Sequence, residues 1–193
     1  MKRERVEVRS RGEWRAWLEV NHQTSPGVWL VTFKRGSAHY FPYGERVEEA
    51  LCFGWVDSLA RGLDDTRSMQ LFTPRNPKSN WSGANKERVA RLTAAGLMAP
   101  AGQAMVDLAR ATGTWTALDD VEAGVEPPDL AAALDAAPGA RRHWDAFPPS
   151  ARRGLLGWLV TAKTSQTRAR RIAEIVTRAA QNVRANQPHR RDR

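Results

Sequence analysis

The eight residues ALCFGWVD, from Ala50 to Asp57, place a thiol, an indole and a carboxylate close together in the chain. A cysteine can act as a nucleophile and a carboxylate as a general base, so this corner could do chemistry. However, Cys52 lies toward the C-terminal end of an expected helix, where the helix dipole disfavours a thiolate. We therefore expect a buried structural thiol at Cys52. Trp55 and Asp57 should share one face of a strand, either lining a pocket or lying on a wet face with the indole half-buried.

A second chemical pattern precedes an expected helix, in residues 74–82 with the sequence PRNPKSNWS. The unpaired amides at a helix N-terminus attract anions. Four side chains could converge with them on a phosphate or carboxylate: Arg75, Lys78, Ser79 and Ser82. The alternative is ordinary capping, in which Ser82 and Asn85 satisfy the amides of the helix itself. The segment lacks the glycines of a P-loop, which argues against nucleoside triphosphate binding.

The last expected helix has an arginine on its apolar side. At 100° per residue, Arg168 lies within the arc formed by Ala169, Ile172, Ile175, Val176, Ala179 and Val183. An arginine there must extend to water, pair with an acid or contact a ligand, and Arg171 is close enough to join it. Asp57 is our preferred acidic partner. The alternative is that the first turn of this helix emerges from the core.

The positive charge is concentrated at the end of the chain. The net charge is +9; residues 1–138 carry 17 Lys and Arg against 18 Asp and Glu, while residues 139–193 carry 13 against 3. A basic end can meet nucleic acid, anionic lipid or an acidic protein, or it can be a solvated tail. The helix pair at residues 84–95 and 100–112 resembles a helix-turn-helix only superficially, because the second helix is too poor in basic residues to read DNA.

Periodicity and turn residues predict an α+β fold. We expect helices over residues 10–22, 43–53, 82–95, 100–113, 130–137, 141–147, 148–163 and 164–184, and strands over 28–33, 55–61 and 68–73. This order predicts a small, mainly antiparallel sheet with helices in the N-terminal half and a helical C-terminal half. The expected parts are residues 1–80 with the sheet, 81–185 as helices packed on it in one compact unit, and 186–193 as a disordered basic tail.

Composition limits the classes of protein that remain. No apolar run is long enough to span a membrane, and the charged N-terminus is unlike a signal peptide, so we expect a cytoplasmic location. One cysteine excludes an internal disulfide, and four scattered histidines offer no zinc-type spacing. We therefore expect neither a metal nor a cofactor.

Four segments together resemble the YdeI/OmpD-associated family, also called the bacteriocin-protection family. They are EEALCFGWVDS at residues 48–58, FTPRNPKSNWSGANKERVARL at 72–92, AAGLMAPAGQAMVDLA at 94–109 and AKTSQTRARRI at 162–172. The resemblance covers nearly the whole chain. It implies a role in protection against peptide toxins or an association with outer-membrane porins, and it brings no reaction, cofactor or catalytic residue.

The first functional hypothesis is a binding or adaptor protein of this type, which takes an anionic small ligand or a protein partner in a polar groove between the sheet and the helical half. The expected site residues are Trp55, Asp57, Arg75, Ser79, Trp81, Asn85, Lys163, Arg168 and Arg171. The second hypothesis is an enzyme that uses Asp57 or Cys52 with Lys163 or Arg168. The third is a non-specific nucleic-acid-binding protein that works through residues 139–193.

Overall fold

The computed structural model describes residues 3–186, which form two compact units, Met1–Thr116 (unit 1) and Ala117–Arg193 (unit 2). The boundary falls later than the expected one after residue 80, because the two helices that follow the sheet pack against a helix of unit 1. The packing of residues 81–185 on the sheet as one unit stays a prediction. The predicted tail lies outside the described residues, apart from Asn186.

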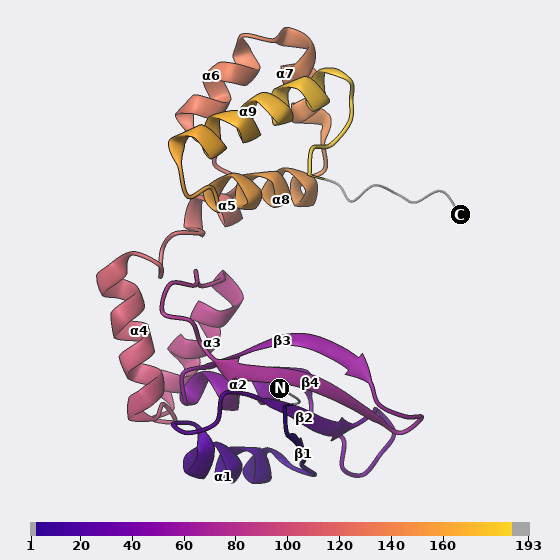
Figure 1. Ribbon diagram of the computed structural model, residues 1–193, viewed down its shortest axis with the longest axis vertical. Coiled ribbons are helices and arrows are strands. Elements are labelled where there is room, and N and C mark those ends of the chain that lie inside the picture. The colour runs from indigo at the N-terminus through magenta and orange to yellow at the C-terminus, as the bar shows by residue number, and fades with distance from the viewer. Residues whose placement is uncertain (1–2, 187–193) are drawn as a thin grey trace. The chain divides into compact units, whose positions relative to one another are not determined.

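Unit 1 contains all four described strands (Figure 1). In chain order its elements are β1 (Arg5–Glu7), α1 (Arg11–Asn21), β2 (Val28–Phe33), α2 (Tyr43–Cys52), β3 (Trp55–Gly62), β4 (Arg67–Pro74), α3 (Gly83–Ala94) and α4 (Pro100–Thr112). The fold class is α+β, as predicted, with a helical C-terminal half.

The strands form one mixed sheet in the order β1-β2-β4-β3. β2 and β3 both pair antiparallel with β4, whereas β1 pairs parallel with β2. The sequence analysis missed β1 because its residues RVE lack the apolar alternation of a half-buried strand. Between Asp57 and Ala60 the register of β3 shifts by a bulge, which bends the strand locally.

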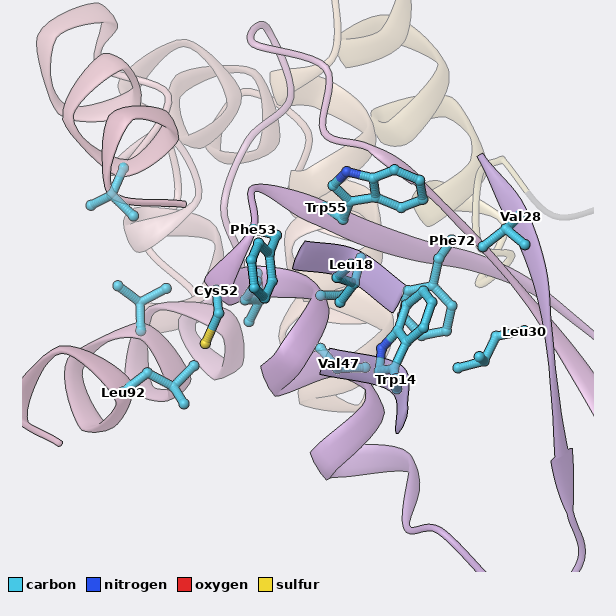
Figure 2. Close-up of a cluster of buried hydrophobic side chains, with 14 of the residues drawn as sticks. Trp14, Leu18, Val28, Leu30, Val47, Cys52, Phe53, Trp55, Phe72 and Leu92 are labelled. Atoms are coloured by element: carbon cyan, nitrogen blue, oxygen red, sulfur yellow. The ribbon is translucent and has the colours of Figure 1, made fainter. Parts of the chain in front are cut away.

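The core of unit 1 lies between one face of the sheet and helices α1 and α2. Trp14 and Leu18 of α1 and Val47 of α2 point toward Phe72 and Leu30 on the strands (Figure 2). All five side chains are 0–1% exposed. Burying large apolar side chains at about 1.5–3 kcal/mol each is the main stabilisation available to a unit of this size.

Unit 2 is entirely helical over its described residues. Its helices are α5 (Asp119–Ala123), α6 (Pro128–Asp135), α7 (Pro138–Ala146), α8 (Pro149–Val160) and α9 (Ser165–Ala180). Leu130, Leu134, Trp144, Leu159 and Ala179 are fully buried and form a separate core. Helix α5 was not predicted from the sequence. No helix among residues 3–186 combines the length and the apolar composition that crossing a membrane requires.

Local sequence signals set most of the helix boundaries. The Ser10 hydroxyl accepts the amide of Glu13 at 3.2 Å at the start of α1. At the start of α9, the Thr164 hydroxyl accepts the amide of Thr167 at 3.1 Å. Gly113 ends α4 with φ = 78°, a left-handed conformation that glycine adopts without steric cost.

Candidate functional site

The corner from Ala50 to Trp55 is a packing junction. Gly54 has φ = 73° and turns the chain from α2 into β3, and the start of α4 lies directly against this turn. The amide of Ala99 donates to the Cys52 carbonyl at 3.1 Å, and a Cβ on Gly102 would lie 2.2 Å from the same oxygen. Only glycine permits this approach, so the corner positions α4.

The Cys52 side chain is buried, as predicted from the sequence. Burial, with a smaller contribution from the nearby Glu49 carboxylate, raises the pKa of the thiol to about 11, although Arg15 opposes the rise. At neutral pH almost no thiolate forms, and the thiolate is the reactive species. The structure therefore argues against the enzyme hypothesis in its Cys52 form.

Trp55 does not line an open groove, so this part of the predicted site is wrong. Its side chain is 1% exposed, its indole nitrogen donates to the His22 carbonyl at 3.1 Å, and its ring meets Trp17 edge-on. These partners lie on and after α1, about 30 residues earlier in the chain, so the strand pattern alone could not reveal them.

Asp57, two residues further along β3, lies in a polar group that we call the Asp57 cluster. It consists of Thr32, Tyr43, Arg46, Asp57, Gln70 and Arg88. Asp57 Oδ2 accepts hydrogen bonds from the Tyr43 hydroxyl at 3.0 Å and from the Gln70 amide at 2.8 Å. Both donors are neutral. Gln70 is only 6% exposed, so its amide is held firmly in place.

Two arginines of the cluster face neutral partners. Arg46 donates to the Thr32 hydroxyl at 2.8 Å, and Arg88 donates to the side-chain carbonyl of Asn85 at 3.0 Å. Arg46 Nε is buried without a hydrogen-bond partner among the described residues, and burial lowers the pKa of this guanidinium. A buried donor without an acceptor costs about 1–3 kcal/mol, and such atoms are rare in native proteins.

Charges of the cluster act on the pKa of the Tyr43 phenol. Burial raises that pKa first and the Asp57 carboxylate raises it further, while the guanidiniums of Arg88 and Arg46 act in the opposite direction. One carboxylate and two guanidiniums therefore lie close enough to influence the same hydroxyl. The cluster carries an excess of one positive charge.

On the strand beside the cluster, β3, the residues that follow Asp57 on the same face are small. The register places Ala60 and Gly62 of β3 opposite Gln70 and Ser68 of β4, on the face that carries Asp57. Ala60 and Gly62 are exposed, and the β3–β4 hairpin reaches past the ends of α1 and α2 (Figure 1). This end of the sheet is therefore a polar platform with small residues.

Arg75 and Trp81 form a second group in unit 1, and the structure brings them together. The Arg75 guanidinium lies 3.8 Å from the Trp81 ring centre and donates to the Asn80 carbonyl at 2.5 Å. Burial lowers the Arg75 pKa to about 10, and its Nε has no partner among the described residues. Because Trp81 is 1% exposed, this pair is buried inside the loop rather than lining a groove, contrary to expectation.

Ser79 and Asn85 serve the local structure around the start of α3. The Ser79 hydroxyl donates to the Asn76 carbonyl at 2.7 Å, which closes the loop. The Ser82 hydroxyl accepts the Asn85 amide at 3.4 Å, as ordinary capping predicts. The side chain of Asn85 is directed to Arg88 and so belongs beside the Asp57 cluster.

In unit 2, Arg168 pairs with Asp129 rather than with Asp57. Its Nε and Nη2 donate to the two Asp129 oxygens at 2.6 and 2.8 Å, a bidentate pair that joins α9 to the first turn of α6. The choice of Asp57 as partner is therefore wrong. A carboxylate in the first turn of a helix is favoured by the helix dipole, which gives Asp129 a local reason to lie there.

Arg171 contacts the C-terminal end of α8. Its guanidinium donates to the Trp158 carbonyl and, at 2.8 Å, to the Thr161 hydroxyl, and it stacks 4.9 Å from the Trp158 ring centre. Lys163 lies exposed between α8 and α9. The predicted site residues thus divide between unit 1 and unit 2, and a groove that joins them stays a prediction.

Sequence reasoning missed five members of the Asp57 cluster, all except Asp57. One signal was available: Thr32 is the polar residue of the otherwise apolar β2, and Gln70 stands among the apolar residues Met69, Leu71 and Phe72 of β4. Buried polar side chains need partners, so such positions mark places where a polar site can form.

Two family models match the chain. Residues 6–105 match the family described as Domain of unknown function (DUF8412), and residues 124–182 match the family described as Bacteriocin-protection, YdeI or OmpD-Associated. The second match includes the AKTSQTRARRI segment, whereas two of the other three segments of the resemblance, and most of the third, lie in the first match. No curated protein and no solved structure matches the chain significantly. Each match falls within one of the two units.

Proposed function

Because this chain belongs to the DUF8412 family through residues 6–105 and carries a bacteriocin-protection, YdeI- or OmpD-associated segment at residues 124–182, we propose that it is a binding protein of the bacteriocin-protection type. It acts in the cytoplasm by holding an anionic ligand, or an anionic group of a protein partner, at the Asp57 cluster. It performs no reaction on that ligand.

The observation that carries this proposal is the state of Arg46 and Arg88. Among residues 3–186 neither guanidinium forms an ion pair, although Arg46 is partly buried. A buried charge without an opposite charge is costly, and an anionic ligand would remove that cost. Helix α2 begins at Tyr43 beside the same group, and its N-terminal amides favour an anion as well.

The proposal is tested by bacterial survival. The wild-type chain is expressed in a strain that is sensitive to bacteriocins, and survival is measured against a panel of them. The wild type should raise survival above that of the empty vector. The double variant Arg46→Gln, Arg88→Gln should lose this effect, whereas Arg9→Gln, which removes one exposed arginine outside the cluster, should keep it. Protection by neither protein, or full protection by the double variant, would contradict the proposal.

A second candidate function, nucleic-acid binding, is favoured by the exposed cations of unit 2. They are Arg142, Arg153, Lys163, Arg170, Arg178 and Arg184. Such a surface would bind single- or double-stranded nucleic acid through phosphates, with an affinity that falls steeply with salt. Fluorescence polarisation with a labelled oligonucleotide decides the matter: no binding at about 50 mM salt eliminates this function.

A further inference from the structure

The Asp57 cluster contains groups that recognise two parts of a ligand. Arg46 and Arg88 supply positive charge, and within residues 3–186 both guanidiniums hydrogen-bond only to neutral groups. Guanidinium groups bind carboxylates and phosphates with paired hydrogen bonds. The first part of the ligand is therefore an anion that reaches Arg46.

Asp57 adds a requirement that a simple anion cannot meet. Both of its donors, from Tyr43 and Gln70, bond to Oδ2 within the described residues. An ionised carboxylate has about four acceptor positions, so Oδ1 can still accept a hydrogen bond from a ligand. The second part of the ligand is therefore a hydroxyl or an ammonium group.

The same carboxylate disfavours a doubly charged anion. A phosphate carries nearly two negative charges at neutral pH, and two like charges at contact distance repel strongly in a partly buried site. A carboxylate carries one charge, which matches the excess of one positive charge in the cluster. Asp57 thus selects against phosphate while it selects for a donor.

We propose that the Asp57 cluster binds a small carboxylate that bears a hydroxyl or ammonium group on the adjacent carbon, as in a hydroxy acid or an amino acid. The carboxylate lies against Arg46 and Arg88, the hydroxyl or ammonium donates to Asp57 Oδ1, and the small residues Ala60 and Gly62 leave room above the sheet. This inference rests on the proposed function for the location of the site.

The test uses the full chain and four probes: sodium lactate, L-alanine, sodium acetate and sodium phosphate. Amide resonances are followed by NMR as each probe is added. Lactate and alanine should shift the resonances of Tyr43, Arg46 and Asp57 with dissociation constants in the millimolar range, about tenfold tighter than acetate. Phosphate should bind more weakly than lactate.

Two variants assign the two halves of the ligand. Arg46→Gln should abolish the shifts caused by lactate and by acetate. Asp57→Asn should leave acetate binding in place and remove most of the preference for lactate and alanine. Arg88→Gln, at a partly exposed position, replaces Arg46→Gln if that variant does not fold. Arg9→Gln serves as the matched control and should bind like the wild type.

The inference is overturned if no probe shifts these resonances at about 50 mM, if the shifts occur elsewhere, or if phosphate binds more tightly than lactate. Lactate binding without protection in the survival assay would contradict the proposed function and leave this inference standing. Protection that depends on Arg46 and Arg88, without binding of any carboxylate, would contradict this inference and leave the proposed function standing.

Discussion

The corner at Cys52–Trp55 and the Asp57 cluster are only two residues apart on β3, but their charged groups are paired differently. At the corner, the thiol of Cys52 and the indole of Trp55 are buried, and the buried carboxylate of Glu49 is paired with two arginines: it accepts from Arg11 at 2.5 Å and from Arg15 at 2.9 Å. In the Asp57 cluster, the charges of Arg46 and Arg88 meet only neutral groups.

The difference follows from how far the helices cover the sheet. Helices α1 and α2 lie over the part that carries Trp55 and Phe72, where large apolar side chains fill the space (Figure 2). Beyond Asp57 the same face of β3 carries Ala60 and Gly62, and these two residues are exposed. A motif rich in reactive residues can thus be structural. The polar groups that can still bind a ligand lie beside the apolar core, in the Asp57 cluster.

The largest effect is expected from Gly102→Ala, which tests whether the corner is structural. The added methyl group would overlap the Cys52 carbonyl, so the start of α4 must move, and we expect a loss of about 3 kcal/mol or more in the free energy of unfolding. Urea denaturation measures it. Gly12→Ala is the matched control: its Cβ meets only the Ser10 hydroxyl, at 3.9 Å, so its stability should change little. Equal stability of both variants would refute the packing role.

Glu49→Gln tests whether the paired charges at the corner hold α1 to α2. The Glu49 side chain is 3% exposed, and the substitution weakens charge-assisted hydrogen bonds with Arg11 and Arg15. We expect about 2 kcal/mol lower stability. The control is Glu19→Gln, whose side chain is 56% exposed and pairs with Arg15 on the surface, where such pairs contribute about 0.5 kcal/mol. A Glu49→Gln variant as stable as the control would remove the contrast between the two regions.

Because the Cys52 thiol is buried, the free energy of unfolding should depend on pH. Its pKa is about 11 in the folded protein against 9.0 for a free thiol, because burial disfavours the thiolate. The unfolded thiol therefore loses its proton first. The contribution to stability is complete below pH 9 and is lost as the pH rises to 11, by about 2 kcal/mol. Unfolding measured across this range should show a steeper fall for the wild type than for Cys52→Ala; parallel curves would mean that the thiol is not sealed.

The smallest change in stability is expected from Arg46→Gln. The variant loses the hydrogen bond to Thr32 but also removes a charge that burial disfavours, so stability should change by less than about 1 kcal/mol. Thermal unfolding checks this value against Glu49→Gln. A loss as large as that of Glu49→Gln would mean that Arg46 is structural, and the difference between the two regions would disappear.

Local patterns were enough to predict much of the fold. The apolar, β-branched run at residues 28–33 is β2, and Ser10 and Thr164 cap α1 and α9. β1 was missed because its stability comes from pairing with β2, more than 20 residues away, rather than from its own residues. The boundary between the units depends on how α3 and α4 pack, which local propensity does not encode.

The site was less predictable because its contacts are tertiary. Asp57 was identified from its alternation with Trp55, but its partners Tyr43 and Gln70 come from α2 and β4. The partner of Arg168 was misassigned because several acids were compatible with the sequence, and only the fold brings Asp129 to it. Wheel positions locate an unusual arginine but do not say what it touches.

The central claim is that Arg46 can bind a ligand, while Arg11 and Arg15 at the corner are already paired with Glu49. The most direct measurement is the ¹H–¹⁵N NMR signal of each arginine Nε during a titration with sodium lactate. The account predicts that the Arg46 Nε signal shifts saturably, because a carboxylate bound to this guanidinium changes the surroundings of the buried Nε, while the Arg11 Nε signal, already bonded to Glu49, stays fixed. An Arg46 signal that does not move, or that moves no more than that of Arg11, would contradict it.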